Sequence, residues 1–277
     1  MFNKMNTKKL CVACKAMKFN EPVRISNTVP LWLRKTNYVQ NFVDSQKEFR
    51  IKRRRGNVMK VCVQLSPEDK GSYVLYWAAT PNDDNLKTKH ARQAYDKFQN
   101  SGICKVQEDG TAIMYIECPQ NYKTIDEDGE YTFYRHLHYM LQQPGKKEWD
   151  NSRFWTLAVT CQFTPEYFRS ILLDKSIMVV NALGSEYDIP GAIHLDPKKR
   201  INTLKRQLVH DLQNYPKIKH AVETNQIDWY AIPMVVYCKD TACHAAENLA
   251  VELYRKGFVN VSVFPGGYDK IIKSKLI

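Results

Sequence analysis

Residues 234–257 read MVVYCKDTACHAAENLAVELYRKG, and this stretch predicts a strand, a loop and a helix. The apolar run at 234–237 predicts a buried strand, and Cys238 follows it directly. A helix is expected from about Cys243 to Lys256, and Gly257 ends it. In an open parallel sheet, ligands bind where strand carboxyl ends meet helix amino termini, so this turn is a candidate site.

The rest of the last third of the chain alternates between strands and helices. Thr164 is expected to cap a short helix, and a second helix lies within residues 198–212. Further strands are expected at 177–180, 192–195 and 259–264. This alternation is typical of a parallel α/β sheet, and we place an α/β domain at residues 162–277.

Five motifs occur in one order in this region: Ile189-Pro190-Gly191-Ala192-Ile193, Val235-Val236-Tyr237-Cys238, Ala245-Ala246 with Leu249 and Leu253, Gly257-Phe258 with Asn260-Val261, and Gly266-Gly267-Tyr268. The succession covers about residues 164–277, which is the size of one domain. It resembles the rhodanese-like domain, the sulfurtransferase fold in which helices wrap a central parallel sheet.

The resemblance implies a catalytic role for Cys238. It also implies a six-residue active loop that begins with Cys238 and continues through Lys239, Asp240, Thr241, Ala242 and Cys243. His244 follows this loop. In this family the cysteine thiolate attacks the outer sulfur of a small anionic donor, becomes a persulfide and passes the sulfur to a thiol acceptor. Loop amides and a helix amino terminus stabilise both the thiolate and the anion. We expect no cofactor and no metal.

The sequence departs from the family pattern at three places. Cys243 stands where many sulfurtransferases have an arginine, so bidentate binding of an oxyanion is lost. Asn181-Ala182 replaces the usual Asp-x-Arg, and Asp188 replaces the histidine before the Ile-Pro-Gly-Ala turn. The related Cys-x5-Arg phosphatases are disfavoured, because the sixth residue after Cys238 is His244.

Two alternatives to catalysis stay open for this domain. Cys238 is either an exposed thiolate or a small buried hydrophobe that ends the strand, and in the second case the domain is a non-catalytic protein-interaction module. Cys243 either resolves an oxidised or persulfidated Cys238 to a disulfide, as a redox sensor would, or faces the core.

Residues 58–161 are expected to form an antiparallel β-sandwich, so the whole chain is α+β. Short alternating apolar runs separated by turn signals carry this prediction, and one helix-like insertion spans Lys87 to Phe98. His136 and His138 share one face of a strand, either as half of a metal site or, as we favour, as paired surface or pocket histidines. A recognition face for a protein partner is expected from Trp77, Tyr95, Tyr122, Tyr131, Tyr134, Tyr139 and Trp149.

Residues 1–57 form a basic N-terminal extension. The chain has a formal net charge of +12, and its first 60 residues hold 15 of the 41 Lys and Arg but 3 of the 29 Asp and Glu. A weak polyanion contact, or a solvated linker, is expected at Arg50, Lys52, Arg53, Arg54 and Arg55. The lone pair Cys11 and Cys14 is half of a zinc-ribbon spacing, for which accident is the favoured explanation.

The sequence also predicts a cellular setting. No apolar run is long enough to span a membrane, so a soluble protein is expected. The polar and basic start carries no secretory signal, which favours an intracellular, cytoplasmic location, with the nucleus as an alternative. In that setting the eight cysteines are expected to be thiols.

Overall fold

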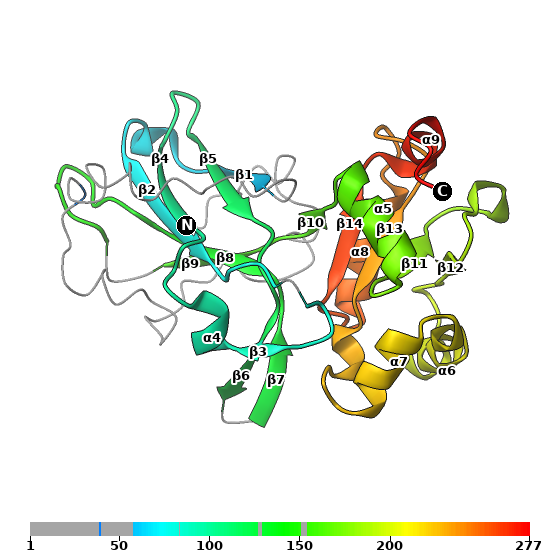
Figure 1. The fold of residues 1–277 in the computed structure, drawn as a ribbon. Helices are drawn as coiled ribbons and strands as arrows, with labels where there is room; N and C mark the ends of the chain where they lie inside the picture. Colours follow the sequence, from blue (N-terminus) through cyan, green and yellow to red (C-terminus); the bar gives the residue numbers. More distant parts are fainter. Residues whose placement is uncertain (1–38, 40–57, 83, 127–128, 151–153) are drawn as a thin grey trace. The chain divides into compact units, whose positions relative to one another are not determined.

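The computed structural model describes residues 39, 58–82, 84–126, 129–150 and 154–277, and it divides the chain into two compact units (Figure 1). The first unit holds the described residues up to 81 together with 90–120 and 135–159. The second unit holds 160–277 together with 82–89 and 121–134. No helix among the described residues is long and apolar enough to cross a membrane.

The second unit is built on a five-stranded sheet of order β10-β14-β13-β11-β12, in which all neighbouring strands are parallel. The strands are β10 (Cys161–Gln162), β11 (Met178–Asn181), β12 (Ile193–His194), β13 (Met234–Tyr237) and β14 (Val261–Phe264). Every residue of β11, β13 and β14 is buried, as expected for central strands covered on both faces. The predicted parallel α/β sheet is confirmed.

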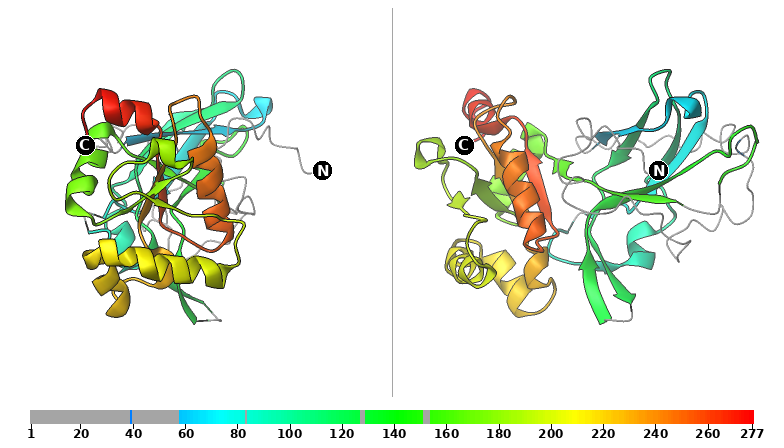
Figure 2. Two further views of the ribbon diagram at one scale, coloured as in Figure 1. Left: turned by 90° about the vertical axis from the view of Figure 1, so that its right-hand side faces the viewer. Right: turned by 180° about the vertical axis from the view of Figure 1, so that it is seen from behind.

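Helices flank this sheet (Figure 2), and they are α5 (Pro165–Asp174), α6 (Ile201–Asp211), α7 (Pro216–Glu223), α8 (Ala245–Arg255) and α9 (Gly267–Lys273). Thr164 caps α5 as expected, since its hydroxyl accepts a hydrogen bond from the Tyr167 N–H at 3.3 Å. Gly257 has φ of +94° and follows α8 as the left-handed residue that ends the helix.

The second unit also contains a hairpin of β6 (Tyr122–Asp126) and β7 (Gly129–Phe133). β3 (Lys89–His90) completes a three-stranded sheet of order β3-β6-β7. The Thr132 hydroxyl donates a hydrogen bond to the Asp228 carboxylate, which ties the hairpin to the rest of the unit.

The first unit consists of two antiparallel sheets, β1-β5 and β4-β2-β8-β9. Their strands are β1 (Val58–Gln64), β2 (Tyr73–Ala78), β4 (Ser101–Lys105), β5 (Thr111–Glu117), β8 (His136–Leu141) and β9 (Trp155–Ala158). Buried residues of both sheets, such as Val63, Met114, Tyr76 and Leu137, share one hydrophobic cluster. The expected antiparallel, sandwich-like arrangement is confirmed.

The helix-like insertion is shorter than the predicted span from Lys87 to Phe98. Only α4 (Ala91–Tyr95) is helical, because Asp96 and Phe98 take positive φ values of 46° and 57° and end the helix after five residues. Positive φ is unfavourable for residues with a Cβ and is not compatible with a continuing right-handed helix.

Two expectations, one about the first unit and one about the cysteines of both units, are wrong. Most aromatic residues assigned to a recognition face are core residues: Trp77, Tyr95, Tyr122, Tyr139 and Trp149 are all buried. The aromatic pattern therefore reports packing and not a docking surface. The second correction concerns Cys118 and Cys161, which are disulfide-bonded, whereas Cys62, Cys104, Cys238 and Cys243 are free thiols.

Candidate functional site

The loop that follows β13 is anchored by the first turn of α9. The N–H of Tyr268 donates to the carbonyl of Cys238 at 2.7 Å, and the N–H of Asp269 donates to the carbonyl of Lys239 at 2.9 Å. Such an approach of backbone to backbone requires a residue without a side chain at the start of α9. A Cβ on Gly267 would lie 2.5 Å from the Lys239 carbonyl oxygen and 2.6 Å from the Asp240 nitrogen.

The middle of the loop is shaped by the side chain of Asp240. Its Oδ1 atom accepts hydrogen bonds from the N–H of Ala242 at 2.9 Å and from the N–H of Cys243 at 3.1 Å. This short-range turn is a common use of aspartate, whose side chain reaches the backbone two and three residues on. It leaves Lys239, Thr241, Ala242 and His244 exposed at the rim.

Cys238 lies at the base of the loop, directly after β13, and is only 1% exposed. Its Sγ atom is 3.0 Å from the carbonyl oxygen of Cys243, which accepts a hydrogen bond from the thiol. Burial raises the pKa of the Cys238 thiol to about 12, although a hydrogen bond from the backbone of Ala246 acts in the opposite direction. Cys238 is therefore a protonated thiol at neutral pH, and of the two expected states, exposed thiolate or buried side chain, the structure has the buried one. Catalysis by Cys238 would need a base that takes its proton.

Cys243 is half-buried, and its pKa lies below the ordinary value for a cysteine. Burial alone would raise this pKa, but hydrogen bonds from the backbone of Lys239 and Ala245 and from the Cys238 thiol outweigh burial. Ala245 and Ala246 belong to the first turn of α8, where N–H groups have no partner inside the helix. Backbone groups at the helix amino terminus thus hydrogen-bond to both sulfurs. Cys243 is the more acidic of the two thiols.

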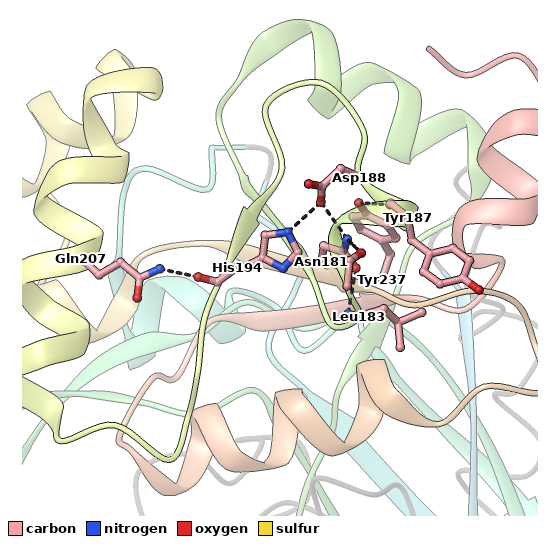
Figure 3. A network of polar contacts seen from close by, with 8 residues as sticks. Asn181, Leu183, Tyr187, Asp188, His194, Gln207 and Tyr237 are labelled. Carbon is pink, nitrogen blue, oxygen red and sulfur yellow. Dashed lines mark hydrogen bonds and ion pairs between the residues drawn. The ribbon is translucent and has the colours of Figure 1, made fainter.

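Two of the residues that differ from the family pattern, Asn181 and Asp188, belong to a polar network at the same edge of the sheet (Figure 3). Asn181, which ends β11, donates through Nδ2 to Asp188 Oδ1 at 2.8 Å and accepts the N–H of Leu183 at 2.8 Å. Asp188 also accepts a hydrogen bond at 2.7 Å from Nε2 of His194. Asn181 and Asp188 therefore support each other.

This network reaches the candidate loop through Tyr237. The Tyr237 hydroxyl, on the last residue of β13, donates to the carbonyl of Tyr187 at 2.8 Å (Figure 3). Since Tyr187 directly precedes Asp188, the strand end that presents Cys238 is joined to the turn beside it.

Some predicted site residues lie elsewhere. Cys11, Cys14, Arg50 and residues 52–55 fall outside the described residues. His136 and His138 lie on β8 in the first unit and are buried, so they are not surface histidines. Burial, with a smaller effect of His136, lowers the pKa of His138 well below its ordinary value.

The anchoring role of α9 was not predicted from the sequence. Gly266-Gly267-Tyr268 was noted only as one motif of a succession, and no helix was expected after it. The sequence signal for this contact is the pair Gly266 and Gly267 after the apolar strand at 261–264, because glycine is common where two backbones approach closely.

A comparison with protein families agrees with this geometry. Residues 164–274 match the Rhodanese-like domain family, which covers less than half of the chain and does not extend into residues 1–163. The C-terminal part of this chain is a rhodanese-like domain, with the expected parallel sheet flanked by helices. No curated protein matches the chain.

Proposed function

We propose that the 238–244 loop transfers sulfane sulfur, that Cys238 carries it as a persulfide, and that Cys243 accepts the proton that Cys238 loses. The observation that supports this best is the pairing of the two thiols within one strand–loop–helix turn. The interaction between the two thiols raises the pKa of Cys238 and lowers that of Cys243, so a proton that Cys238 loses has an acceptor in the same loop.

The first half-reaction balances with the groups in the loop. The Cys238 sulfur attacks the outer sulfur of thiosulfate, and its proton passes to the Cys243 thiolate. A sulfur–sulfur bond forms on Cys238 while the donor's sulfur–sulfur bond breaks, and sulfite leaves with the electron pair. The amides of the first turn of α8 face the negative charge of the new persulfide.

The second half-reaction restores the loop. A thiolate acceptor, or cyanide, attacks the outer persulfide sulfur and takes it, and Cys238 leaves as a thiolate that the Cys243 thiol reprotonates. No oxidant is consumed in either step, because the sulfane sulfur passes from one nucleophile to another.

A turnover assay tests this proposal. The full chain is incubated with thiosulfate and cyanide, and thiocyanate is measured for the wild type, Cys238→Ser and Cys62→Ser. Cys62 is a matched control because it is a free thiol in the first unit. We expect turnover by the wild type and Cys62→Ser and none by Cys238→Ser. Equal turnover by the wild type and Cys238→Ser would refute the proposal.

A second candidate function is redox sensing by the same cysteine pair. The lowered pKa of the half-buried Cys243, and the presence of a second free thiol in the same loop, support it. Hydrogen peroxide would oxidise one thiol to a sulfenic acid, and the other would displace water to give a disulfide. A protein that forms a Cys238–Cys243 disulfide with peroxide, but no thiocyanate from thiosulfate and cyanide, would be a sensor.

A further inference from the structure

A second cluster of reactive side chains lies in the first unit, on the face of the β4-β2-β8-β9 sheet that is turned away from β1-β5. His136 and His138 of β8 lie on this face, because their neighbours Leu137 and Tyr139 point into the core shared by the two sheets. Tyr95 of α4 completes the cluster. Strand β8 and α4 can be followed in Figure 1.

Three potential ligand atoms lie in this cluster, and Nε2 of His136 contacts the other two. The Nε2 atoms of His136 and His138 are 3.2 Å apart, and the Tyr95 hydroxyl is 3.2 Å from Nε2 of His136. The three side chains are between 1% and 5% exposed. Within the part of the chain that the structure describes, no three His, Cys, Asp or Glu side chains form a group that could hold a metal ion, so a metal at this cluster would need the Tyr95 phenol as its third protein ligand.

Two of the contacts in this cluster meet at one nitrogen atom. A neutral imidazole nitrogen offers either one N–H or one lone pair. Nε2 of His136 faces both the Tyr95 hydroxyl and Nε2 of His138, so one hydrogen or one lone pair is shared between two partners. A cation removes the competition, because all three atoms can then present lone pairs to it.

The distances fit a transition-metal ion. Metal–ligand distances of about 2.1 Å, combined with a ligand separation of 3.2 Å, give a ligand–metal–ligand angle of roughly 100°. This angle lies between the octahedral and tetrahedral values. Two imidazoles and a phenolate are ligands for zinc, copper or iron, whereas calcium and magnesium prefer sites made of oxygen atoms.

The surroundings hold the ligands in place. Nδ1 of His138 is 2.8 Å from Oγ1 of Thr156 on β9, which is the outer hydrogen bond that orients a metal-binding histidine. The rings of Trp77 and Phe154 lie 5.5 Å and 5.0 Å from the His138 ring, centre to centre. These buried aromatic rings restrict the movement of the imidazole and exclude bulk water.

We propose that Tyr95, His136 and His138 bind one divalent transition-metal ion through the phenolate oxygen and the two Nε2 atoms. On binding, Tyr95 releases its proton to solvent. The sequence-based expectation of a chain without metal is replaced by this proposal, and the proposal is independent of sulfur transfer in the second unit.

Metal content tests the proposal directly. The full chain is expressed with added Zn²⁺, Cu²⁺ and Fe²⁺, purified, and analysed by inductively coupled plasma mass spectrometry. We expect about one ion per wild-type chain and at least a tenfold weaker Kd for Zn²⁺ in Tyr95→Phe, which keeps the buried ring. His138→Gln should lose the ion altogether.

Two control variants should keep the ion. His220→Gln removes an exposed histidine of α7, and Cys11→Ser combined with Cys14→Ser removes the other metal-like pair of the sequence. Loading with Co²⁺ adds a spectroscopic readout, since visible absorption bands should appear in the wild type and change in Tyr95→Phe. A wild type that holds under about a tenth of an ion after Zn²⁺ loading would overturn the proposal. Unchanged Zn²⁺ affinity in Tyr95→Phe would overturn it as well.

Discussion

The Sγ atom of Cys238 lies 3.0 Å from the carbonyl oxygen of Cys243, so the loop between the two cysteines closes on itself. This closure places a buried thiol with a raised pKa next to a more exposed thiol with a lowered pKa. In the proposed division of roles, Cys238 carries the persulfide because it corresponds to the catalytic cysteine of the rhodanese-like family, and the more acidic Cys243 sulfur takes its proton.

The first prediction concerns the pH dependence of sulfur loading. Loading requires the Cys243 thiolate, so in the wild type the rate should rise with pH through a pKa below the ordinary cysteine value. Cys243→Ser should slow loading at neutral pH by about 10²-fold, the typical contribution of a positioned base. Its profile should also move to higher pH, toward the value of about 12 for Cys238. Both the loading rate and its pH dependence can be measured by stopping reactions at several pH values and analysing the protein by mass spectrometry. An unshifted profile in Cys243→Ser would contradict the proton role.

The second prediction concerns Gly267, which lies under the loop. Gly267→Ala brings a Cβ within 2.5 Å of the Lys239 carbonyl and strains a residue with φ of +59°. We expect a loss of about 2–4 kcal/mol in the free energy of unfolding, from left-handed strain together with overpacking, and slower sulfur loading.

Gly191→Ala is the matched control for Gly267→Ala. Gly191 also has positive φ, +82°, but nothing lies within 4 Å of its added Cβ. It should lose about 1–2 kcal/mol from strain alone and keep its loading rate. Urea unfolding gives the two free energies, and equal losses would show that the loop does not depend on the close approach of α9.

The third prediction separates the shape of the loop from its charge at Asp240. Asp240→Asn keeps an acceptor for the N–H groups of Ala242 and Cys243 but removes a negative charge that raises the Cys243 pKa. Alkylation of Cys243 by iodoacetamide should therefore begin at lower pH in this variant. Asp240→Ala removes the acceptor too and should cost about 1 kcal/mol of stability. The interpretation is wrong if Asp240→Asn moves alkylation to higher pH.

The fourth prediction concerns Asn181, which replaces a family aspartate. Asn181→Asp turns a donor to Asp188 and to the Gly184 carbonyl into a buried carboxylate beside the exposed carboxylate of Asp188. At pH 7 we expect a loss of about 2–3 kcal/mol in the free energy of unfolding.

This loss should depend on pH in a defined direction. The introduced carboxyl group has a higher pKa in the folded than in the unfolded protein, so the penalty should grow from about pH 4 to pH 7 and shrink in acid. His194→Gln, at the exposed end of the same network, should cost under about 1 kcal/mol. A penalty for Asn181→Asp that is independent of pH would contradict this account.

The fold of the second unit could largely be predicted from the sequence. The apolar run of β13 and the left-handed Gly257 after α8 are local signals, and the structure confirms both elements to within two residues at each end. Helices α7 and α9 were missed. α7 spans only eight residues and α9 only seven, so each offers about two turns of periodicity.

The candidate site was predictable in position but not in chemistry. Cys238 could be placed at the strand end, because strand and helix lengths follow from local patterns. Its carbonyl accepts a hydrogen bond from the N–H of Tyr268, thirty residues further on, and no local pattern reveals this contact. Likewise, the period of two placed His136 and His138 on one face, whereas the tyrosine opposite them comes from α4.

The most direct test of the central claim is the intact mass of the full chain after incubation with thiosulfate under non-reducing conditions, followed by peptide mapping. We predict one added sulfur atom on Cys238, removed by cyanide, absent in Cys238→Ser and retained in Cys62→Ser. An added sulfur that persists in Cys238→Ser, or no adduct in the wild type, would contradict the claim that Cys238 carries a persulfide.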